Sequence, residues 1–226
     1  MELNLQFFGG RGADSDGEPL SSDNGESIDI EETLIIEEYG GISPSNREFA
    51  NDIENSVDEI RKDFPGIHDT TMREVDAVVM NGIDNTQTLG FYGDGQVAIN
   101  ANYTNVDKMN TVYDNAVSRG YHPSRGDKTG TQAVTYHEMG HAINDYIAGK
   151  MSGKQNFNSA AKLIVNRAYK ADKGKGGTKA WAGKISGYAQ KSYAECIAEG
   201  VSDFYCNGNK ASSASKAIMA ELKRYS

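Results

Sequence analysis

The sequence predicts an α+β fold for residues 42–226, with a small mixed sheet and a helical C-terminal half, preceded by an acidic arm of residues 1–41. Three observations lead to this prediction. An amphipathic helix pattern comes first, stretches rich in β-branched and aromatic residues follow it, and helical spacing then dominates the remaining chain. The 226 residues are enough for one domain with a real core.

The arm of residues 1–41 is strongly acidic. It contains eleven acidic side chains and a single base, Arg11, whereas the formal charge of the whole chain is −9, so the remaining residues are close to neutral. Residues 9–32 have almost nothing to bury, and such a segment is expected to be disordered. Because no basic surface dominates the remainder, no nucleic-acid partner is expected. No long apolar run or signal peptide is visible, so no membrane partner is expected either.

The first elements of the domain follow from local signals. Ser43 is an N-cap followed by proline at the first helical position, and apolar residues then recur at helical spacing until Pro65 ends the helix. Residues 74–82 have the branched apolar content of a strand, and residues 88–103 read as two strands joined around a Gly-Asp-Gly turn. We expect these strands to form the small mixed sheet.

The second half of the chain has the periodicity of helices. The lysine- and glycine-rich residues 170–184 are expected to form a solvated loop between two of them. Cys196 and Cys206 fall on one predicted helix with their Cα atoms roughly 15 Å apart, too far for a disulfide. The predicted helices span residues 106–118, 131–148, 156–171, 192–206 and 212–224.

The segment TYHEMGHAINDY (135–146) contains a pattern with the chemistry of a metal site. Residues four apart share one face of a helix, so His137 and His141 present two imidazoles side by side, with Glu138 beside them. Two imidazole nitrogens can bind Zn²⁺, and a neighbouring carboxylate can take a proton from water. The pattern also arises by chance. Here the surrounding residues are largely apolar, and unpaired polar side chains are costly in such a setting.

A catalytic zinc needs a third protein ligand. The candidates on the downstream helix are Glu195, Cys196, Glu199 and Asp203. Glu195 also fits the capping box Ser192-Tyr-Ala-Glu195, which would give it a purely structural role. Glu199, one turn further on, would accept a hydrogen bond from a ligand histidine or would be solvated.

Together, TYHEMGHAINDY and ISGYAQKSYAECIAEGVSDFY (185–205) resemble the catalytic domain of the anthrax toxin lethal factor-like zincins, which are gluzincin metallopeptidases. In that family a tyrosine precedes the ligand glutamate by seven residues, and a second acid follows it by four. Tyr188, Glu195 and Glu199 have this spacing. The resemblance covers roughly residues 75–210, most closely around these two segments. It implies a zincin-like metallopeptidase fold with an active-site helix.

The resemblance also implies roles for individual residues. His137, His141 and Glu195 would be the zinc ligands, Glu138 the general base and Tyr188 a catalytic hydroxyl. The implied function is a zinc-dependent endopeptidase that cleaves protein or peptide substrates with metal-activated water. His68 and His122 lack partners at ligand spacing, so both are expected to be ordinary residues.

The N-terminal residues LNLQFFGGRG (3–12) are similar to the opening of minor head proteins of phages and prophages. This similarity implies a phage or prophage origin, phage structural proteins as partners, and a location in the host cytoplasm or the phage particle. The alternative function is a phage structural or interaction protein that retains a zincin fold without turnover. For the enzyme, residues 96–103 would pair with an extended substrate if they lie at the sheet edge over the cleft.

Overall fold

A computed structural model of the chain describes residues 44–67, 78–80, 88–93, 96–100, 103–151 and 156–226. The acidic arm, the phage-like opening and His68 therefore lie outside the described residues. The helices are α1 Pro44–Asp63, α3 Val106–Ser118, α4 Gly130–Lys150, α5 Phe157–Ala171, α6 Gly177–Ala182, α7 Tyr193–Asn207 and α8 Ser213–Leu222. The short 3-10 helices are η2 Tyr188–Gln190, η3 Gly208–Lys210 and η4 Lys223–Tyr225, and the strands are β1 Val78–Met80, β2 Gly90–Gly93 and β3 Gln96–Asn100.

The predicted α+β fold class is wrong for the described residues, most of which are helical. The strands have only three, four and five residues, too few to form a layer of comparable size to the helices. These residues therefore do not form the zincin-like α+β fold that was expected. The strand patterns occur in the predicted order along the chain, but the strands they form are short. The helical second half is confirmed.

The three short strands pair in the order β1-β3-β2, so the central strand is β3. It runs parallel to β1 and antiparallel to β2, with Gly90 opposite Ile99. The expectation that this strand lies at the sheet edge and pairs with substrate is therefore wrong, because β1 and β2 use both of its edges.

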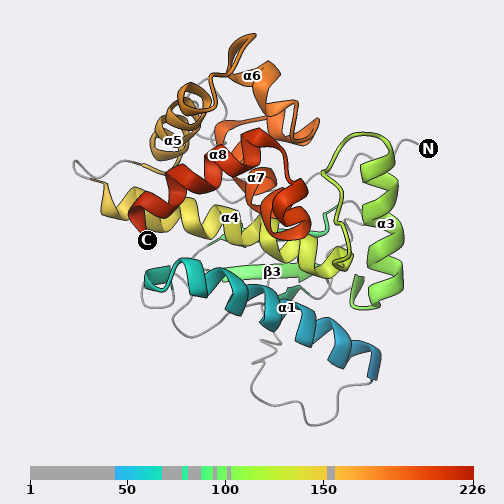
Figure 1. The fold of residues 1–226 in the computed structure, drawn as a ribbon. Helices are drawn as coiled ribbons and strands as arrows, with labels where there is room; N and C mark the ends of the chain where they lie inside the picture. The colour runs from blue at the N-terminus through green and yellow to red at the C-terminus, as the bar shows by residue number, and fades with distance from the viewer. Residues whose placement is uncertain (1–43, 68–77, 81–87, 94–95, 101–102, 152–155) are drawn as a thin grey trace, which may run out of the picture.

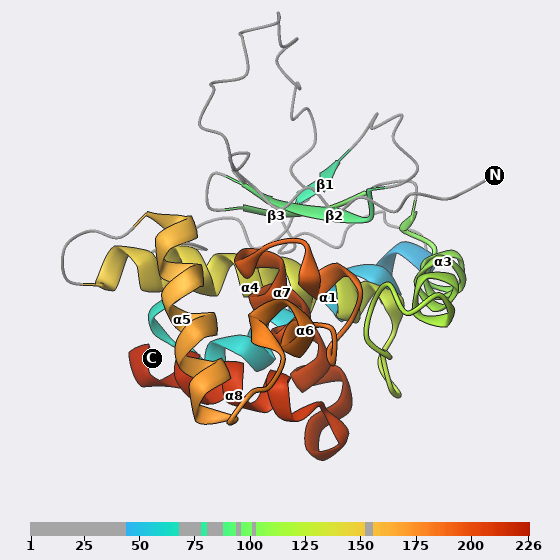
Figure 2. The ribbon, with the colours of Figure 1, turned by 90° about the horizontal axis from the view of Figure 1, so that it is seen from above.

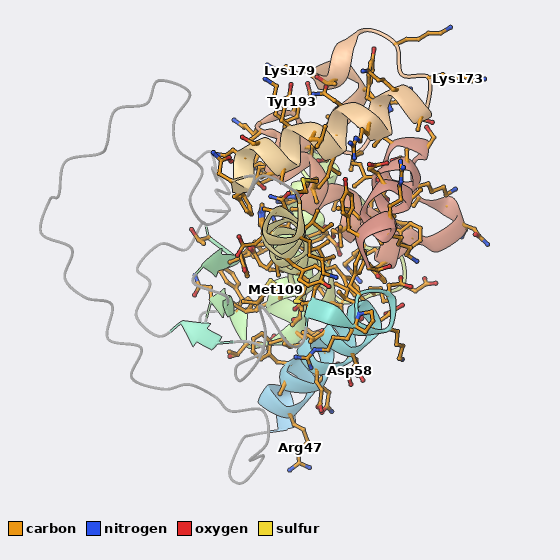
Figure 3. All side chains as sticks on the ribbon, turned by 90° about the vertical axis from the view of Figure 1, so that its left-hand side faces the viewer. Arg47, Asp58, Met109, Lys173, Lys179 and Tyr193 are labelled. Carbon is orange, nitrogen blue, oxygen red and sulfur yellow. The ribbon has the colours of Figure 1, made fainter. Side chains whose placement is uncertain are left out.

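Helix α4 runs through the centre of the molecule (Figure 1). The strands lie on one side of it, and α5, α6, α7 and α8 lie on the other (Figure 2). It packs against α7 most extensively and also contacts α1, α3, α5, β2 and β3. Side chains fill the interior between these elements: Met109 is buried there, whereas Arg47 and Lys173 project outward (Figure 3). Because neighbours surround α4, nearly all of its side chains are buried, the histidines included.

Local signals explain where α4 begins and how closely it approaches α7. The Thr129 hydroxyl caps the helix by accepting from the backbone N–H of Gln132, and the Gln132 side-chain oxygen accepts from the backbone N–H of Thr129. Gly140 lies between the two histidines, and a Cβ atom at this position would lie 2.7 Å from the Cα of Ala198. The missing side chain therefore allows α4 and α7 to make close backbone contact.

The lysine- and glycine-rich residues 170–184 are more ordered than predicted. They contain the short helix α6, in which the Trp181 ring is fully buried and its Nε1 donates to the Asp172 carboxylate at 2.7 Å. The Trp181 ring also meets the edge of the Tyr169 ring at a centroid distance of 5.8 Å. Burial of this one large side chain holds the segment against the protein although its lysines are solvated.

Among the described residues, no helix combines the length and apolar character that a membrane span requires.

Candidate metal centre

Helix α4 places two histidines and a glutamate in the protein interior. His137 and His141 are one turn apart, and their ring centroids lie 5.1 Å from each other with the planes at 80°. Glu138 is fully buried beside them. Ligand atoms of these three side chains all lie within 4.8 Å of one another, and the group could hold a metal ion.

Helix α7 brings two further carboxylates to the same place. Ser192 caps this helix, its hydroxyl accepting a hydrogen bond from the backbone N–H of Glu195 at 3.0 Å. Glu195 and Glu199 are one turn apart and both are buried. Ser192 therefore caps α7, as the capping-box pattern predicted. The Glu195 carboxylate lies against the histidines of α4, so its position is not explained by the cap alone.

The side chains of α4 and α7 converge through particular atoms. Glu195 Oε2 lies 3.2 Å from His137 Nε2 and 3.5 Å from His141 Nε2. Two ring nitrogens and a carboxylate oxygen thus surround one position. A metal cation placed between these atoms would be attracted to all three, because each has a lone pair to share.

The polar atoms of this cluster fit a metal ion. Glu138 Oε1 and Oε2, His141 Nδ1 and Nε2, and Glu195 Oε2 are buried and have no hydrogen-bond partner among the described residues. Buried polar atoms normally have partners, and leaving several without them in one cluster costs free energy. A cation with its water would satisfy such a set, so the donor chemistry agrees with a metal centre.

Charges within the cluster shift the pKa values of its members. Burial raises the pKa of Glu138 to about 8, and the Glu195 and Glu199 carboxylates add to this rise while His137 opposes it. Burial alone would also raise the pKa of Glu195, but His141 and His137 lower it to about 2. Burial lowers the pKa of His137, yet the adjacent Glu195 and Glu199 carboxylates raise it well above its usual value. The electrostatic field of the cluster therefore favours a positive charge at its centre.

The Glu199 carboxylate lies behind His137 and accepts three hydrogen bonds. Its Oε1 accepts from Nδ1 of His137 at 2.8 Å and from Nδ1 of His122 at 2.9 Å. Its Oε2 accepts from the Ser186 hydroxyl at 2.6 Å. Burial raises its pKa, but the two histidines lower it to about 2, so Glu199 is ionised. Of the two roles that the sequence left open, solvation is excluded, because Glu199 is 1% exposed.

His122 and Ser186 are residues of this cluster that the sequence analysis missed. His122 was expected to be an ordinary loop residue, but it is buried and its ring stacks on Tyr113 at a centroid distance of 5.4 Å. It lies 77 residues from Glu199 in the chain, so spacing offers no signal for their contact. Ser186 lies 13 residues from Glu199, outside any helical repeat.

Tyr188 begins the short helix η2 and is buried at the same cluster. Its ring centroid lies 5.9 Å from that of His137, 5.5 Å from that of His122 and 5.0 Å from that of Tyr121. Burial raises its pKa far above the usual value, and the Glu195 carboxylate adds to the effect. Its hydroxyl therefore stays protonated and remains a hydrogen-bond donor.

The other candidates for a third ligand have different surroundings. Asp203 accepts hydrogen bonds from the Ser212 backbone, the Ser215 hydroxyl and the Asn207 amide, so it stabilises the connection from α7 to α8. Cys196 is a buried free thiol that lines a pocket between α5, α6 and α7. Glu195, in contrast, lies against both His137 and His141.

Comparisons of the chain with protein-family models, with curated proteins and with solved structures find no match. The interpretation of the metal centre therefore rests on the residues and their geometry.

Proposed function

We propose that the protein is a zinc-dependent endopeptidase in which His137, His141 and Glu195 hold the metal. Tetrahedral zinc with bonds of about 2.0 to 2.2 Å places neighbouring ligand atoms roughly 3.3 to 3.6 Å apart. The distance from Glu195 Oε2 to Nε2 of His141 is 3.5 Å, within this range, and that to Nε2 of His137 is 3.2 Å, just below it. Two imidazoles and one carboxylate also suit zinc better than calcium or magnesium, which prefer oxygen ligands.

Zinc, when bound, would supply Lewis acidity that activates water and polarises a substrate carbonyl. Glu138 would take a proton from the attacking water at one carboxylate oxygen and pass it to the departing amine. A pKa near neutral pH suits both transfers, and burial raises that of Glu138 to about 8. No partner among the described residues occupies its oxygens, which leaves them available for this role.

Tyr188 would donate its hydroxyl to the oxygen that becomes negatively charged as the peptide carbonyl is attacked. The proposal is supported by the position of its ring beside His137 and by a pKa that keeps the hydroxyl protonated. The resemblance to lethal factor-like metallopeptidases implies the same role.

The observation that carries the proposal is the placement of Glu138. In this proposal His137, His141 and Glu195 hold the metal, so Glu138 is a second carboxyl that is fully buried and has no hydrogen-bond partner among the described residues. A protein that used its metal only for structure would gain nothing from this costly residue.

The Glu138→Gln variant tests the proposal because it removes the base and leaves the three ligands in place. Wild-type protein loaded with zinc should cleave members of a broad peptide library, and the variant should bind one zinc per chain and cleave none. Asp145→Asn is the matched control: it makes the same chemical change on the same helix, at an exposed position bonded to Tyr92. If the wild-type protein binds zinc but cleaves no peptide, the alternative function would be favoured, namely a phage structural or interaction protein without turnover.

A further inference from the structure

The Glu199 carboxylate joins the metal ligand His137 to two chain segments around Tyr188. One carboxylate oxygen accepts from His137 and His122, and the other accepts from Ser186. Both histidines face this carboxylate with their Nδ1 atoms. This fixes the ring of His137 with its Nε2 directed toward Glu195.

The two segments, Gly120–His122 and Ser186–Ala189, are hereafter called the tyrosine frame. They are also joined through their backbones, because the N–H of Gly187 donates to Gly120 O at 2.8 Å and that of Tyr188 donates to Tyr121 O at 3.0 Å. A Cβ on Gly187 would lie 3.0 Å from Gly120 O, so glycine permits this close approach.

Each segment of the tyrosine frame has one side chain that is hydrogen-bonded to Glu199. The Ser186 hydroxyl donates to Glu199 and accepts from the backbone N–H of Ala189 at 3.0 Å, which closes the turn that carries Tyr188. His122 donates to Glu199 from the other segment, and its ring packs against the Tyr188 ring. The backbone and the ring of Tyr188 are thus both held by groups that Glu199 anchors.

We infer that His122 and Ser186 are positioning residues. Through Glu199, they hold Tyr188 at a fixed position relative to the metal ligand His137. This inference rests on the proposed function and adds two residues to it. Neither residue touches the position between His137, His141 and Glu195. They act through the tyrosine frame, so their loss misplaces the Tyr188 hydroxyl while the metal ligands remain.

Amide hydrogen exchange tests the frame without any substrate. His122→Phe keeps an aromatic ring against Tyr113 and Tyr188 but loses the hydrogen bond to Glu199. In the zinc-loaded protein it should speed exchange at the amides of Gly187 and Tyr188 by roughly tenfold or more, because their acceptors lie in the segment that His122 anchors. Exchange in α8 should not change. Ser186→Ala provides a second variant and should speed exchange at Tyr188, whose own acceptor it leaves intact.

Ser202→Ala is the matched control for these variants. It removes another buried hydroxyl of this region, one that donates to the backbone oxygen of Ala133 at 3.0 Å and has no hydrogen bond to Glu199 among the described residues. This variant should leave exchange at Gly187 and Tyr188 at the wild-type rate. Unchanged exchange at these amides in both His122→Phe and Ser186→Ala, or an equal increase in Ser202→Ala, would overturn the inference.

Kinetics then test whether the two residues act through Tyr188. Each variant should lower kcat by roughly 10- to 100-fold and change KM little. In a Tyr188→Phe background the same substitutions should lower kcat much less, because the hydroxyl they position is already absent. Fully additive losses would overturn the coupling. Absence of wild-type turnover would overturn the peptidase proposal instead, and the exchange result would still decide whether the frame exists.

Discussion

The proposed role of Tyr188 depends on its hydroxyl group alone. Tyr188→Phe should lower kcat by roughly 10² to 10³, the usual cost of losing a donor to a developing oxyanion. KM should change little, because that charge exists only in the transition state. The check is steady-state kinetics together with zinc content, which should stay at the wild-type value. Turnover equal to that of the wild type would remove Tyr188 from the mechanism.

The thiols of Cys196 and Cys206 lead to a second prediction at the residue scale. Burial raises the pKa of each to about 12 from an ordinary value near 9. At pH 8 the reactive thiolate is therefore roughly a thousandfold rarer than in the unfolded chain. We expect slow reaction of native protein with a disulfide reagent and fast reaction in urea. Rapid labelling of both thiols in native protein would contradict their burial.

The same shift makes stability depend on alkaline pH. A pKa that is higher in the folded state means that folding disfavours the thiolate. The contribution of each cysteine to the free energy of unfolding is thus fully present below pH 9 and is lost as the pH rises toward about 12. Substitution of Cys206 by alanine should make this alkaline loss smaller in urea denaturation.

At the scale of elements, the contact between α4 and α7 determines whether the carboxylates reach the histidines. Gly140→Ala would place a Cβ 2.7 Å from the Cα of Ala198, which is backbone and cannot rotate away. We expect the helices to move apart, the free energy of unfolding to fall by about 1 to 3 kcal/mol and zinc affinity to fall with it. Urea denaturation and zinc titration against a chelator measure the two effects.

Gly149→Ala is the control for this substitution on the same helix. A Cβ at that position meets no atom within 4 Å, so the variant should be as stable as the wild type or slightly more stable. Equal free energies of unfolding and equal zinc affinities of the two alanine variants would show that the close approach of α4 and α7 at Gly140 affects neither quantity.

At the scale of the whole molecule, the proposed zinc would connect helices that are distant in the chain. The proposed ligands His137 on α4 and Glu195 on α7, for example, are 58 residues apart. A ligand that binds only the folded protein stabilises it, by about 4 kcal/mol at a free concentration of a thousand times Kd. Removal of zinc with a chelator should therefore lower Tm, and added zinc should restore it.

The Glu195→Ala variant distinguishes binding at this centre from nonspecific binding. With one ligand removed, its Tm should no longer respond to zinc at concentrations that saturate the wild type. A full zinc-dependent rise of Tm in this variant would show that Glu195 is not a ligand.

Local periodicity in the sequence by itself determined the helices and the pairing of residues on them. The turn of an α-helix places His137 with His141, and Glu195 with Glu199, whatever the rest of the chain does. The caps and proline that bound these helices also act over a few residues, and for this reason α1, α3, α4 and α7 lie where they were predicted. The resemblance to a known family implied Glu195 as a ligand and Tyr188 as a catalytic hydroxyl, and the structure places both side chains at the cluster without testing these roles.

Tertiary structure alone decided which of these pairs meet and what surrounds them. The contact of His122 with Glu199 spans 77 residues and depends on the packing of α7 against α4, which no local pattern encodes. The short length of the strands and the central position of β3 also depend on pairing between distant residues. For this reason the predicted fold class and the predicted edge position of β3 were wrong. Burial of Trp181 ordered a segment whose composition indicated a loop. Packing free energy between distant segments decided each of these outcomes, and such packing becomes visible only when the chain is folded.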